Sequence, residues 1–374
     1  ISKLDNTNSY DSYLISVSNL DNTKVQFAEI VILSDKVDNY ILRKGNVSNQ
    51  TTNPGSFDLV VDEFDDSYFR FVPEDPYDTD YDLKIHKVIF EDSIVGIGTT
   101  SVGFIDIIGK NETATSGITT TLVGVNTNNF GSLYANVQVI DNTTNDMNFV
   151  ELYLTHDGEN TYISEYYFDS EIQTSGYSGN FMGSFTSDIS NDILSLSYTN
   201  NTQKTNTLRA KVVGFGTTST PGVGGSYRFK LERQPDGSER TIIYQSNNVV
   251  GVGVTTVLSI DKNKFNAVKS LVEVGIGTIK SVHQVYMIQD TSDVHITQSA
   301  LLSVSGINTF DTAMGIGTFG GNNSGSTLDL TFTPDSDYSA STITVSALSE
   351  LFYTDLDVSN VPPALEYGKI REDI

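Results

Sequence analysis

The hydrophobic and polar positions of the chain follow the pattern of short β-strands. Apolar and polar residues alternate in segments such as 68–72 and 133–139, and Val, Ile, Thr, Tyr and Phe are abundant. Gly, Asn, Asp and Ser interrupt these segments at short, regular intervals, as turns do between strands. No stretch has the sustained 3.6-residue period of an amphipathic helix. The pattern predicts an all-β protein built of antiparallel β-sandwiches that are Ig-like or jelly-roll-like.

Three segments with this alternation are similar to one another. They are Phe27-Ala-Glu-Ile-Val-Ile-Leu-Ser-Asp35, Phe149-Val-Glu-Leu-Tyr-Leu-Thr-His-Asp157 and Val282-His-Gln-Val-Tyr-Met-Ile-Gln-Asp290. At the same distance after each aspartate come Tyr40-Ile41, Tyr162-Ile163 and His295-Ile296. The copies lie a domain length apart, not the roughly 20–50 residues that are typical of solenoids and propellers. The repeat therefore predicts three modules of one fold, with Phe27, Phe149 and Val282 at one equivalent core position.

The repeat divides the chain into tandem modules with connecting segments. The expected boundaries are 1–95 for β-sandwich module 1, 96–121 for a linker, 122–218 for module 2, 219–250 for a linking β-hairpin, 251–355 for module 3 and 356–374 for an extended C-terminal tail. Each module is expected to contain about six strands, enough for an antiparallel sandwich. The chain has no starting methionine, and we expect it to be an excerpt of a longer polypeptide or a processed one.

Composition narrows the range of partners and cofactors. The chain has 22 Lys and Arg against 47 Asp and Glu, a net charge of −25, which argues against nucleic acid and against an anionic membrane as partner. No cysteine is present, so disulfides and thiolate metal sites are excluded. No apolar run approaches the length of a membrane-spanning helix. We expect no cofactor and no catalytic residue.

A glycine-rich motif recurs near the module boundaries. It reads Val95-Gly-Ile-Gly-Thr-Thr100, Gly214-Phe-Gly-Thr-Thr218 and Val250-Gly-Val-Gly-Val-Thr-Thr256. We interpret these segments as sharp turns where the chain leaves one sandwich for the next. A further copy, Gly315-Ile-Gly-Thr-Phe-Gly320, matches the dinucleotide-binding fingerprint, which requires a helix after it. A loop and a strand are expected there instead, so the pattern favours a structural turn.

The hairpin at 219–250 is the most basic part of the chain. The segments 227–233 and 239–244 flank Pro235-Asp-Gly-Ser238, which is a turn signal. The basic residues are Arg228, Lys230, Arg233 and Arg240. They belong either to an arm that packs on the adjacent sandwich or to an inter-subunit contact that binds an acidic neighbouring subunit. Because an isolated two-stranded hairpin is marginal in water, we expect this one to lie on another surface.

Other candidate sites have a plainer explanation. The four histidines are His86, His156, His283 and His295. They do not have the convergent spacing of a zinc site, and we interpret them as ordinary strand or turn residues. Asp78, Asp80 and Asp82 begin like a calcium loop, but Leu83 and Ile89 stand where such a loop needs Gly and Glu. Solvated loop charge is favoured there, and calcium between modules is the alternative.

Several segments resemble a β module that recurs in virion structural proteins of tailed phages, especially contractile-tailed marine cyanophages. The segments are 148–158 with 161–166, 228–244, 265–274 with 283–290, and 349–355 with 362–368. Module 1 fits this pattern only through the internal repeat, and it has Ser34-Asp35-Lys36 where module 2 has His156-Asp157-Gly158. The resemblance implies a non-enzymatic component of a virus particle.

The repeat and the resemblance together predict a structural component of a phage virion. We expect an extended rod or appendage of tandem modules, as in a tail fibre, baseplate or neck, which contacts other virion proteins, copies of itself and a possible host surface receptor. The alternative is a bacterial extracellular adhesin or filament protein with Ig-like repeats. A less favoured alternative is a surface-glycan depolymerase, which needs paired carboxylates in a groove. Glu29, Glu151 and Glu165 are the candidates, and strand register explains their recurrence.

Overall fold

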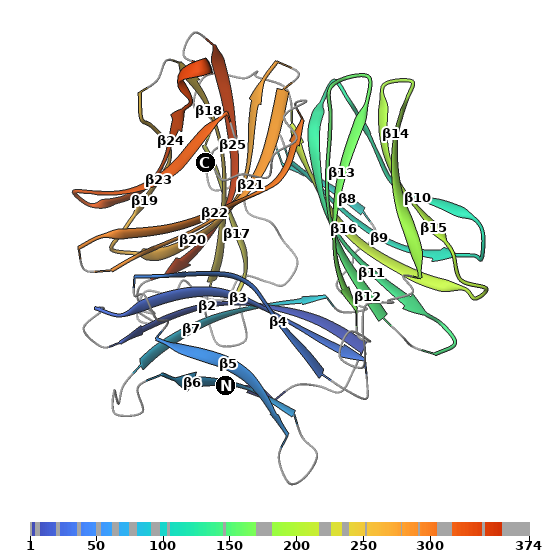
Figure 1. Ribbon diagram of the computed structural model, residues 1–374, viewed down its shortest axis with the longest axis horizontal. Coiled ribbons are helices and arrows are strands. Elements are labelled where there is room, and N and C mark those ends of the chain that lie inside the picture. The colour runs from blue at the N-terminus through green and yellow to red at the C-terminus, as the bar shows by residue number, and fades with distance from the viewer. Residues whose placement is uncertain are drawn as a thin grey trace.

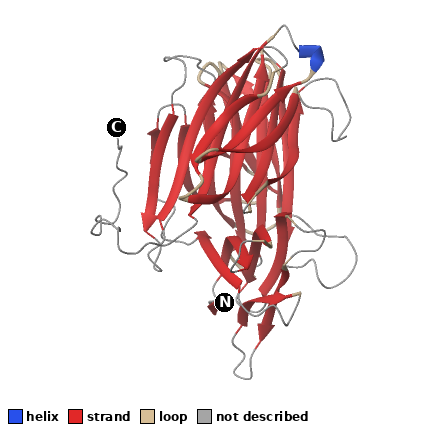
Figure 2. Cartoon of the chain, turned by 90° about the vertical axis from the view of Figure 1, so that its left-hand side faces the viewer, coloured by secondary structure: helices blue, strands red, loops and turns tan. Residues whose placement is uncertain are grey.

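The structure of the chain is a computed structural model, shown in Figure 1. It describes residues 2–3, 8–19, 23–35, 39–49, 54–61, 67–74, 81–90, 98–102, 105–144, 147–169, 182–216, 226–233, 239–250, 253–277, 279–290, 292–304, 316–338 and 341–353. These residues form β-strands almost throughout, and the 3₁₀ turn Ser336–Tyr338 is the single helical element among them (Figure 2). The prediction of an all-β fold with antiparallel sheets is confirmed. Within the described part of the chain, no helix has the length and apolar character to span a membrane.

Module 1 is a four-stranded sheet packed on a three-stranded sheet. The larger sheet has the strand order β4-β3-β2-β7 and the smaller has the order β1-β6-β5. The strands are β1 (Ser2–Lys3), β2 (Asn8–Asn19), β3 (Val25–Asp35), β4 (Asn39–Ser48), β5 (Gly55–Val61), β6 (Ser67–Pro73) and β7 (Tyr81–Phe90). The core between the two sheets includes Ile15, Ile30 and Phe69, each fully buried.

Module 2 has the same plan with a larger first sheet. Its sheets have the orders β13-β12-β11-β16-β9-β8 and β10-β15-β14. The strands are β8 (Gly98–Val102), β9 (Ile105–Ala114), β10 (Thr119–Asn126), β11 (Phe130–Asp141), β12 (Met147–His156), β13 (Thr161–Asp169), β14 (Gly183–Ser190), β15 (Ile193–Asn200) and β16 (Asn206–Gly216). Its core includes Val137, Leu152, Leu196 and Leu208.

Module 3 repeats the plan of module 2. Its sheets have the orders β17-β18-β25-β20-β21-β22 and β19-β24-β23. The strands are β17 (Ser226–Arg233), β18 (Glu239–Val250), β19 (Thr255–Asp261), β20 (Phe265–Ile276), β21 (Ile279–Gln289), β22 (Val294–Val304), β23 (Gly317–Ser324), β24 (Thr327–Pro334) and β25 (Thr342–Tyr353). Its core includes Val272, Met287, Leu330 and Phe332.

The six strands expected in each module are present, together with a seventh. The additional strand is β1 in module 1, β10 in module 2 and β19 in module 3, and it lies at one edge of the smaller sheet of its module. Strands β10 and β19 begin with threonines, so their alternation is weak in sequence. The glycine motif at Val250–Thr256 lies between β18 and β19, and it therefore connects the two sheets of one module and not two modules.

The segment 96–121, expected as a linker, contains strands and extends the sheet of module 2. Strands β8 and β9 form a hairpin, and β9 pairs with β16 along its whole length. The hairpin at 219–250 is the equivalent element of module 3, because β18 pairs with β25 in the same way. The alternation of Ile105 and Ile107 is too short a signal to reveal β9 in isolation. Both connecting segments are thus part of the sandwich that follows them in sequence.

A close backbone contact recurs in all three modules. The glycine at the start of β5, β14 and β23 faces an aromatic ring of the next strand, and a Cβ there would lie within 2.6 Å of that ring. The pairs are Gly55 with Phe71, Gly183 with Tyr198, and Gly317 with Phe332. Gly317 belongs to the segment that matches the dinucleotide-binding fingerprint. It lies in strand β23 and no helix follows it, so the glycine serves strand packing.

The three modules pack around a common centre and do not form a line (Figure 1). Strands β21 and β22 of module 3 lie against β3 and β4 of module 1, and β12 and β13 of module 2 lie against β22. The expected extended rod is therefore not the arrangement within this chain. The domain-length spacing of the repeats predicted the modules but not their packing, because spacing carries no information on which faces meet.

Candidate functional site

The side of each large sheet that faces away from its own sandwich core forms the junction between modules. In a strand, alternate side chains lie on opposite faces. Val150 and Leu152 of β12 therefore face the core of module 2, while Glu151 between them faces the junction. Ala28 and Ile30 of β3 flank Glu29 in the same way. The chain thus buries both faces of these strands.

The three copies of the repeat place two glutamates and one glutamine at one equivalent strand position. Glu29 lies opposite Leu14, Glu151 opposite Asn136, and Gln284 opposite Leu271 in the matching strand pairs. All three side chains are buried. Strand register, which was expected to explain the recurrence of Glu29 and Glu151, thus also brings them toward the same point. Glu165 lies on β13 opposite Leu152 and is not equivalent to them.

Two lysines from different modules neutralise the two glutamates. The Lys44 ammonium lies 2.5 Å from Glu151 Oε1 and 3.6 Å from Glu29 Oε1. The Lys269 ammonium lies 2.8 Å from Glu29 Oε1. Lys44 belongs to module 1, Glu151 to module 2 and Lys269 to module 3, so this network joins all three modules. We call Glu29, Lys44, Glu151 and Lys269 the junction cluster.

Tyrosine hydroxyls complete the hydrogen bonds of the junction cluster. Tyr286 donates to Glu29 Oε2 across the interface between modules 3 and 1 at 2.5 Å. Tyr153 and Tyr134 lie with their hydroxyls 3.3 Å from the two oxygens of Glu151. Because buried charges are tolerated only when paired and hydrogen-bonded, this arrangement explains how four ionisable side chains remain inside the molecule.

Two neighbouring lysines keep the Glu29 carboxyl ionised although it is buried. Burial by itself would raise the pKa of the Glu29 carboxyl, but Lys269 and Lys44 outweigh that effect and lower the pKa to about 2. Burial would likewise lower the pKa of Lys44, but Glu151 and Glu29 raise it above its usual range. For Lys269 burial is the larger effect and lowers its pKa, with Glu29 acting in the opposite direction. Burial also raises the pKa of Tyr286 well above its usual value, so its hydroxyl remains a donor.

An apolar cluster adjoins the junction cluster between modules 1 and 3. It consists of Leu14, Val25, Phe27, Val47, Ala267, Tyr286 and Ile288. The rings of Phe27 and Tyr286 meet edge to face with centroids 6.0 Å apart. Phe27, Phe149 and Val282 do occupy one strand position of the repeat, and all three are buried. None of the three belongs to the core of its own sandwich, because each lies on the opposite face of its sheet, and Phe27 packs in this interface. The predicted equivalence therefore holds, whereas the predicted core placement is wrong.

The conserved spacing between aspartate and aromatic residue in the repeat is explained by hairpin turns. Asp157 Oδ1 accepts the backbone N–H groups of Glu159 and Asn160, and its other oxygen accepts the hydroxyl of Tyr162. These hydrogen bonds hold the pKa of Asp157 well below its usual range.

The corresponding turn of module 3 also contacts module 1. Asp290 Oδ1 accepts the backbone N–H groups of Ser292 and Asp293, and Oδ2 lies 2.8 Å from His295 Nε2. The same Oδ2 accepts the Asn49 amide at 2.9 Å. The aspartate therefore holds the hairpin turn in both modules, and in module 3 it also joins the turn to module 1.

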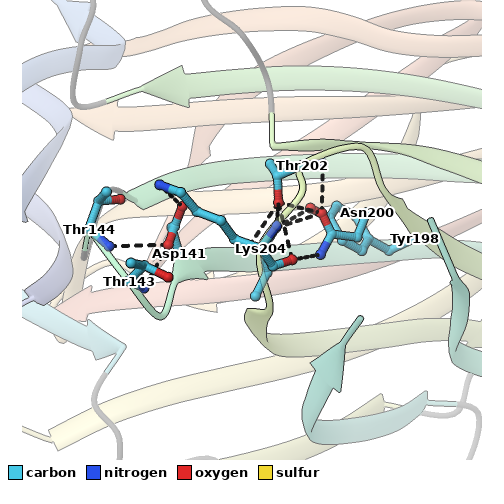
Figure 3. Close-up of polar contacts among 8 residues, drawn as sticks. Asp141, Thr143, Thr144, Tyr198, Asn200, Thr202 and Lys204 are labelled. Atoms are coloured by element: carbon cyan, nitrogen blue, oxygen red, sulfur yellow. Dashed lines mark hydrogen bonds and ion pairs between the residues drawn. The ribbon is translucent and has the colours of Figure 1, made fainter. Parts of the chain in front are cut away.

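A second polar cluster lies at one end of module 2 (Figure 3). Asp141 Oδ1 accepts the backbone N–H groups of Thr143 and Thr144, and its Oδ2 lies 3.0 Å from the Lys204 ammonium. The buried Asn200 amide donates to the Lys204 carbonyl at 2.8 Å. The hydrogen bonds hold each turn in shape, and the ion pair between Lys204 and Asp141 joins the two turns, so this cluster fixes the strand ends.

The described histidines all have hydrogen-bonding partners. His156 Nε2 lies 2.7 Å from the Phe130 carbonyl, and His283 Nε2 lies 2.8 Å from Ser281 Oγ. Burial lowers the pKa of His283 to about 4. His86 lies on β7, and its side chain is outside the described part of the structure. Among the residues that the structure describes, no three His, Asp or Glu side chains gather as metal ligands.

For the remaining predicted site residues, the structure describes the strands of some and none of the side-chain contacts. Arg228, Lys230 and Arg233 are on β17 and Arg240 is on β18, so the hairpin of the proposed inter-subunit contact is the outer edge of module 3's larger sheet. Their side-chain contacts are outside the described part. So are Asp78 and Asp80 of the candidate calcium loop.

Sequence reasoning missed Lys44 and Lys269. Neither belongs to a motif, and their positions on β4 and β20 are not equivalent. The sequence contains one weak indication of Lys269. It alternates with apolar residues in its strand, and the residues on either side of it, Val268 and Ser270, are both buried. A charged residue on a strand that buries both faces indicates a buried partner.

Comparison of the chain with protein-family models, with curated proteins and with solved structures finds no match. The interpretation of the site therefore depends on its own geometry. The two glutamates of the junction cluster are buried, their charges are balanced by two lysines, and they accept hydrogen bonds from tyrosines of modules 2 and 3. Such an arrangement fixes the relative positions of modules.

Proposed function

We propose that the chain is a non-enzymatic structural component of a phage virion, in which it acts as one three-lobed building block. The observation that carries the proposal is the junction cluster, in which Lys44, Glu151 and Lys269 come from three different modules. A molecule that joins three like sandwiches through one buried network suits transmission of mechanical load. The resemblance of residues 148–158 and 228–244 to phage virion modules supports the particle assignment.

The proposal places the block in a tail fibre, baseplate or neck, in contact with other virion proteins. Length in such an appendage would come from stacking several blocks and not from the three modules of one chain. The net charge of −25 favours solubility before assembly and protein partners over nucleic acid.

The carboxylates at the junction give no support to the depolymerase alternative. Glycosidases need two carboxyl groups at a groove that admits a sugar ring. Glu29 and Glu151 have side chains only 3% and 2% exposed, and each is paired with a lysine. The pairing favours packing as their role.

The test is localisation of the chain by an antibody raised against the purified protein. Immuno-electron microscopy and mass spectrometry should detect it in stoichiometric amounts in purified particles of the phage that carries the gene, with label confined to one organelle. Label on bacterial surfaces and none on particles would support the adhesin alternative. Cleavage of surface glycans by the purified chain, lost on one carboxylate substitution, would contradict a structural role.

A further inference from the structure

The interface between modules 2 and 3 contains a buried carboxyl group outside the junction cluster. Glu273 of β20 lies between Val272 and Val274, which belong to the core of module 3, so its side chain is on the sheet face toward the junction. It is 7% exposed, and its Oε2 has no hydrogen-bonding partner among the residues that the structure describes. The Ser132 hydroxyl of module 2 approaches the carboxyl group from across the interface.

The other two modules have neutral side chains at the strand position of Glu273. Glu273 lies opposite Val282, and the residues at its place in the equivalent strand pairs of modules 2 and 1 are Gln138 and Ser16. Both are buried. A neutral polar group therefore satisfies the fold of the module at this position, and the carboxyl group of Glu273 is a feature of module 3.

Hydrogen bonds within module 2 determine which group donates across the interface. The Thr155 hydroxyl donates to the Gly131 carbonyl at 2.9 Å, and the Ser132 hydroxyl donates to Thr155 Oγ1 at 3.0 Å. A hydroxyl has one proton, so Ser132 has only lone pairs left for Glu273. An ionised carboxylate is also an acceptor only, whereas a protonated carboxyl group can donate to Ser132 Oγ. The neutral form of Glu273 is therefore the form that fits the interface.

Burial outweighs the charges around Glu273, in contrast to Glu29. Burial raises the pKa of the Glu273 carboxyl, and the Lys280 ammonium of the adjacent strand offsets only part of that effect. Burial also lowers the pKa of Lys280, against the attraction of Glu273 and Asp157. On its other side, strand β25 places the uncharged Ser346 opposite Glu273. Burial and hydrogen bonding thus favour the same protonated form.

The histidine of module 2 that faces this interface, His156, remains neutral. Its Nε2 donates to the Phe130 carbonyl at 2.7 Å, and its Nδ1 accepts the backbone N–H of Gly158 at 3.1 Å. Both ring nitrogens are therefore occupied by the neutral ring, and burial lowers the pKa of the imidazole. Glu273 is left as the group at this interface that takes up a proton between neutral and mildly acidic pH.

We propose that Glu273 is a proton switch between modules 2 and 3, closed when its carboxyl group donates to Ser132 and loosened when the proton is lost. An exposed glutamate has a pKa of about 4.5, and the closed interface raises it. The contribution of the proton to closure is therefore complete below pH 4.5 and is lost as pH rises from 4.5 through the raised pKa. The inference does not depend on the chain being a virion component.

The test follows exchange of backbone amides in the full chain from pH 5 to 8, corrected for the intrinsic effect of pH on exchange. Strands β12 and β22 of the two modules lie against each other. One proton that is bound in the closed form and released in the open form changes the opening equilibrium by about tenfold per pH unit. Exchange at β12 and β22 should accelerate by up to about this factor as pH rises, without change at β14 and β15.

Glu273→Gln is the decisive variant, because its amide donates a hydrogen bond without titrating and glutamine is the residue of module 2 at this position. The acceleration at β12 and β22 should be absent in this variant. The matched control is Glu165→Gln, which removes another carboxyl group whose pKa burial raises, on strand β13, and it should leave the acceleration intact.

A direct titration keeps the proposal testable if Glu273→Gln folds poorly. In the unsubstituted chain with ¹³C-labelled glutamate, the carboxyl resonance of Glu273 should report a protonated group at pH 5. An ionised Glu273 at pH 5 would overturn the proposal, and so would exchange at the interface that does not depend on pH. Acceleration that persists in Glu273→Gln would assign the pH dependence to another group, such as His156, and would also overturn it.

Discussion

The interior of each sandwich and the junction between sandwiches are buried by different chemistry. The core of module 2 is closed by apolar side chains such as Leu152, Leu196 and Leu208. At the junction, two buried glutamates pair with two lysines whose side chains are 10% and 18% exposed. Apolar packing tolerates many arrangements of similar volume, whereas ion pairs demand particular partners. We infer that the cores supply most of the stability and that the junction cluster specifies one arrangement of the modules.

The largest effect is expected from Lys44→Met, which removes one of two cations from the junction cluster. Breaking a buried pair by deleting one partner costs about 3–5 kcal/mol, because the other charge stays buried. Denaturant unfolding should show this loss, and hydrogen exchange should rise at strands β3, β12 and β21.

Two matched variants define the cause of the Lys44→Met effect. Adding Glu151→Gln should recover part of the loss, because it removes the uncompensated carboxylate. Arg70→Met, which breaks the exposed pair with Asp58, should leave stability unchanged. Equal effects of the buried and exposed substitutions would contradict a specific role for the junction.

Leu196→Ala tests the contribution of a sandwich core to stability. Leu196 is 0% exposed in the core of module 2, and truncation of such a residue costs about 2–5 kcal/mol. Ile193→Ala on the same strand, where the side chain is 38% exposed, should cost well under half as much. Exchange should rise throughout module 2 and not along the junction. A loss centred on β3 and β21 would show that the cores and the junction are not separable.

Gln284→Glu sharpens the difference among the three copies of the repeat. It places a third carboxylate at the position of Glu29 and Glu151 without a third lysine, and we expect a loss of about 1–3 kcal/mol at neutral pH. Burial should raise the folded-state pKa of the new carboxyl, so the loss should shrink as pH falls and the group takes up a proton. The isosteric control is Gln284→Met. A pH-independent loss would mean that shape and not charge distinguishes this copy.

The last prediction concerns the dependence of stability on acid pH. The folded pKa of Glu29, about 2, lies below its ordinary value of 4.5, so the ionised group stabilises the fold above pH 4.5. That contribution is lost as pH falls from 4.5 through about 2. The difference in unfolding free energy between the wild type and Glu29→Gln should therefore stay constant from pH 7 to 5 and decline below. A difference already gone at pH 4 would contradict the pairing with Lys269 and Lys44.

The strands of the larger sheets could be predicted because their apolar alternation is strong. Strand β12 buries all ten of its residues, and its sequence reads as an apolar segment with one carboxylate. The seventh strands β10 and β19 and the hairpin β8–β9 were missed, because their threonine- and glycine-rich sequences resemble connections. The turn role of Asp157 and Asp290 could be suspected from the fixed spacing to Tyr162 and His295, although only the contacts explain it.

The sequence by itself determined the all-β fold and the three like modules, because strand periodicity and repeat spacing are local properties. Tertiary structure alone decided that Glu29 and Glu151 converge on Lys44, and that Lys269 joins them from the third module. The two glutamates share a position of the repeat, but the two lysines are distant from them in sequence and belong to no motif. Their proximity results from which sheet faces meet, and that depends on the fit of whole surfaces once the modules have folded.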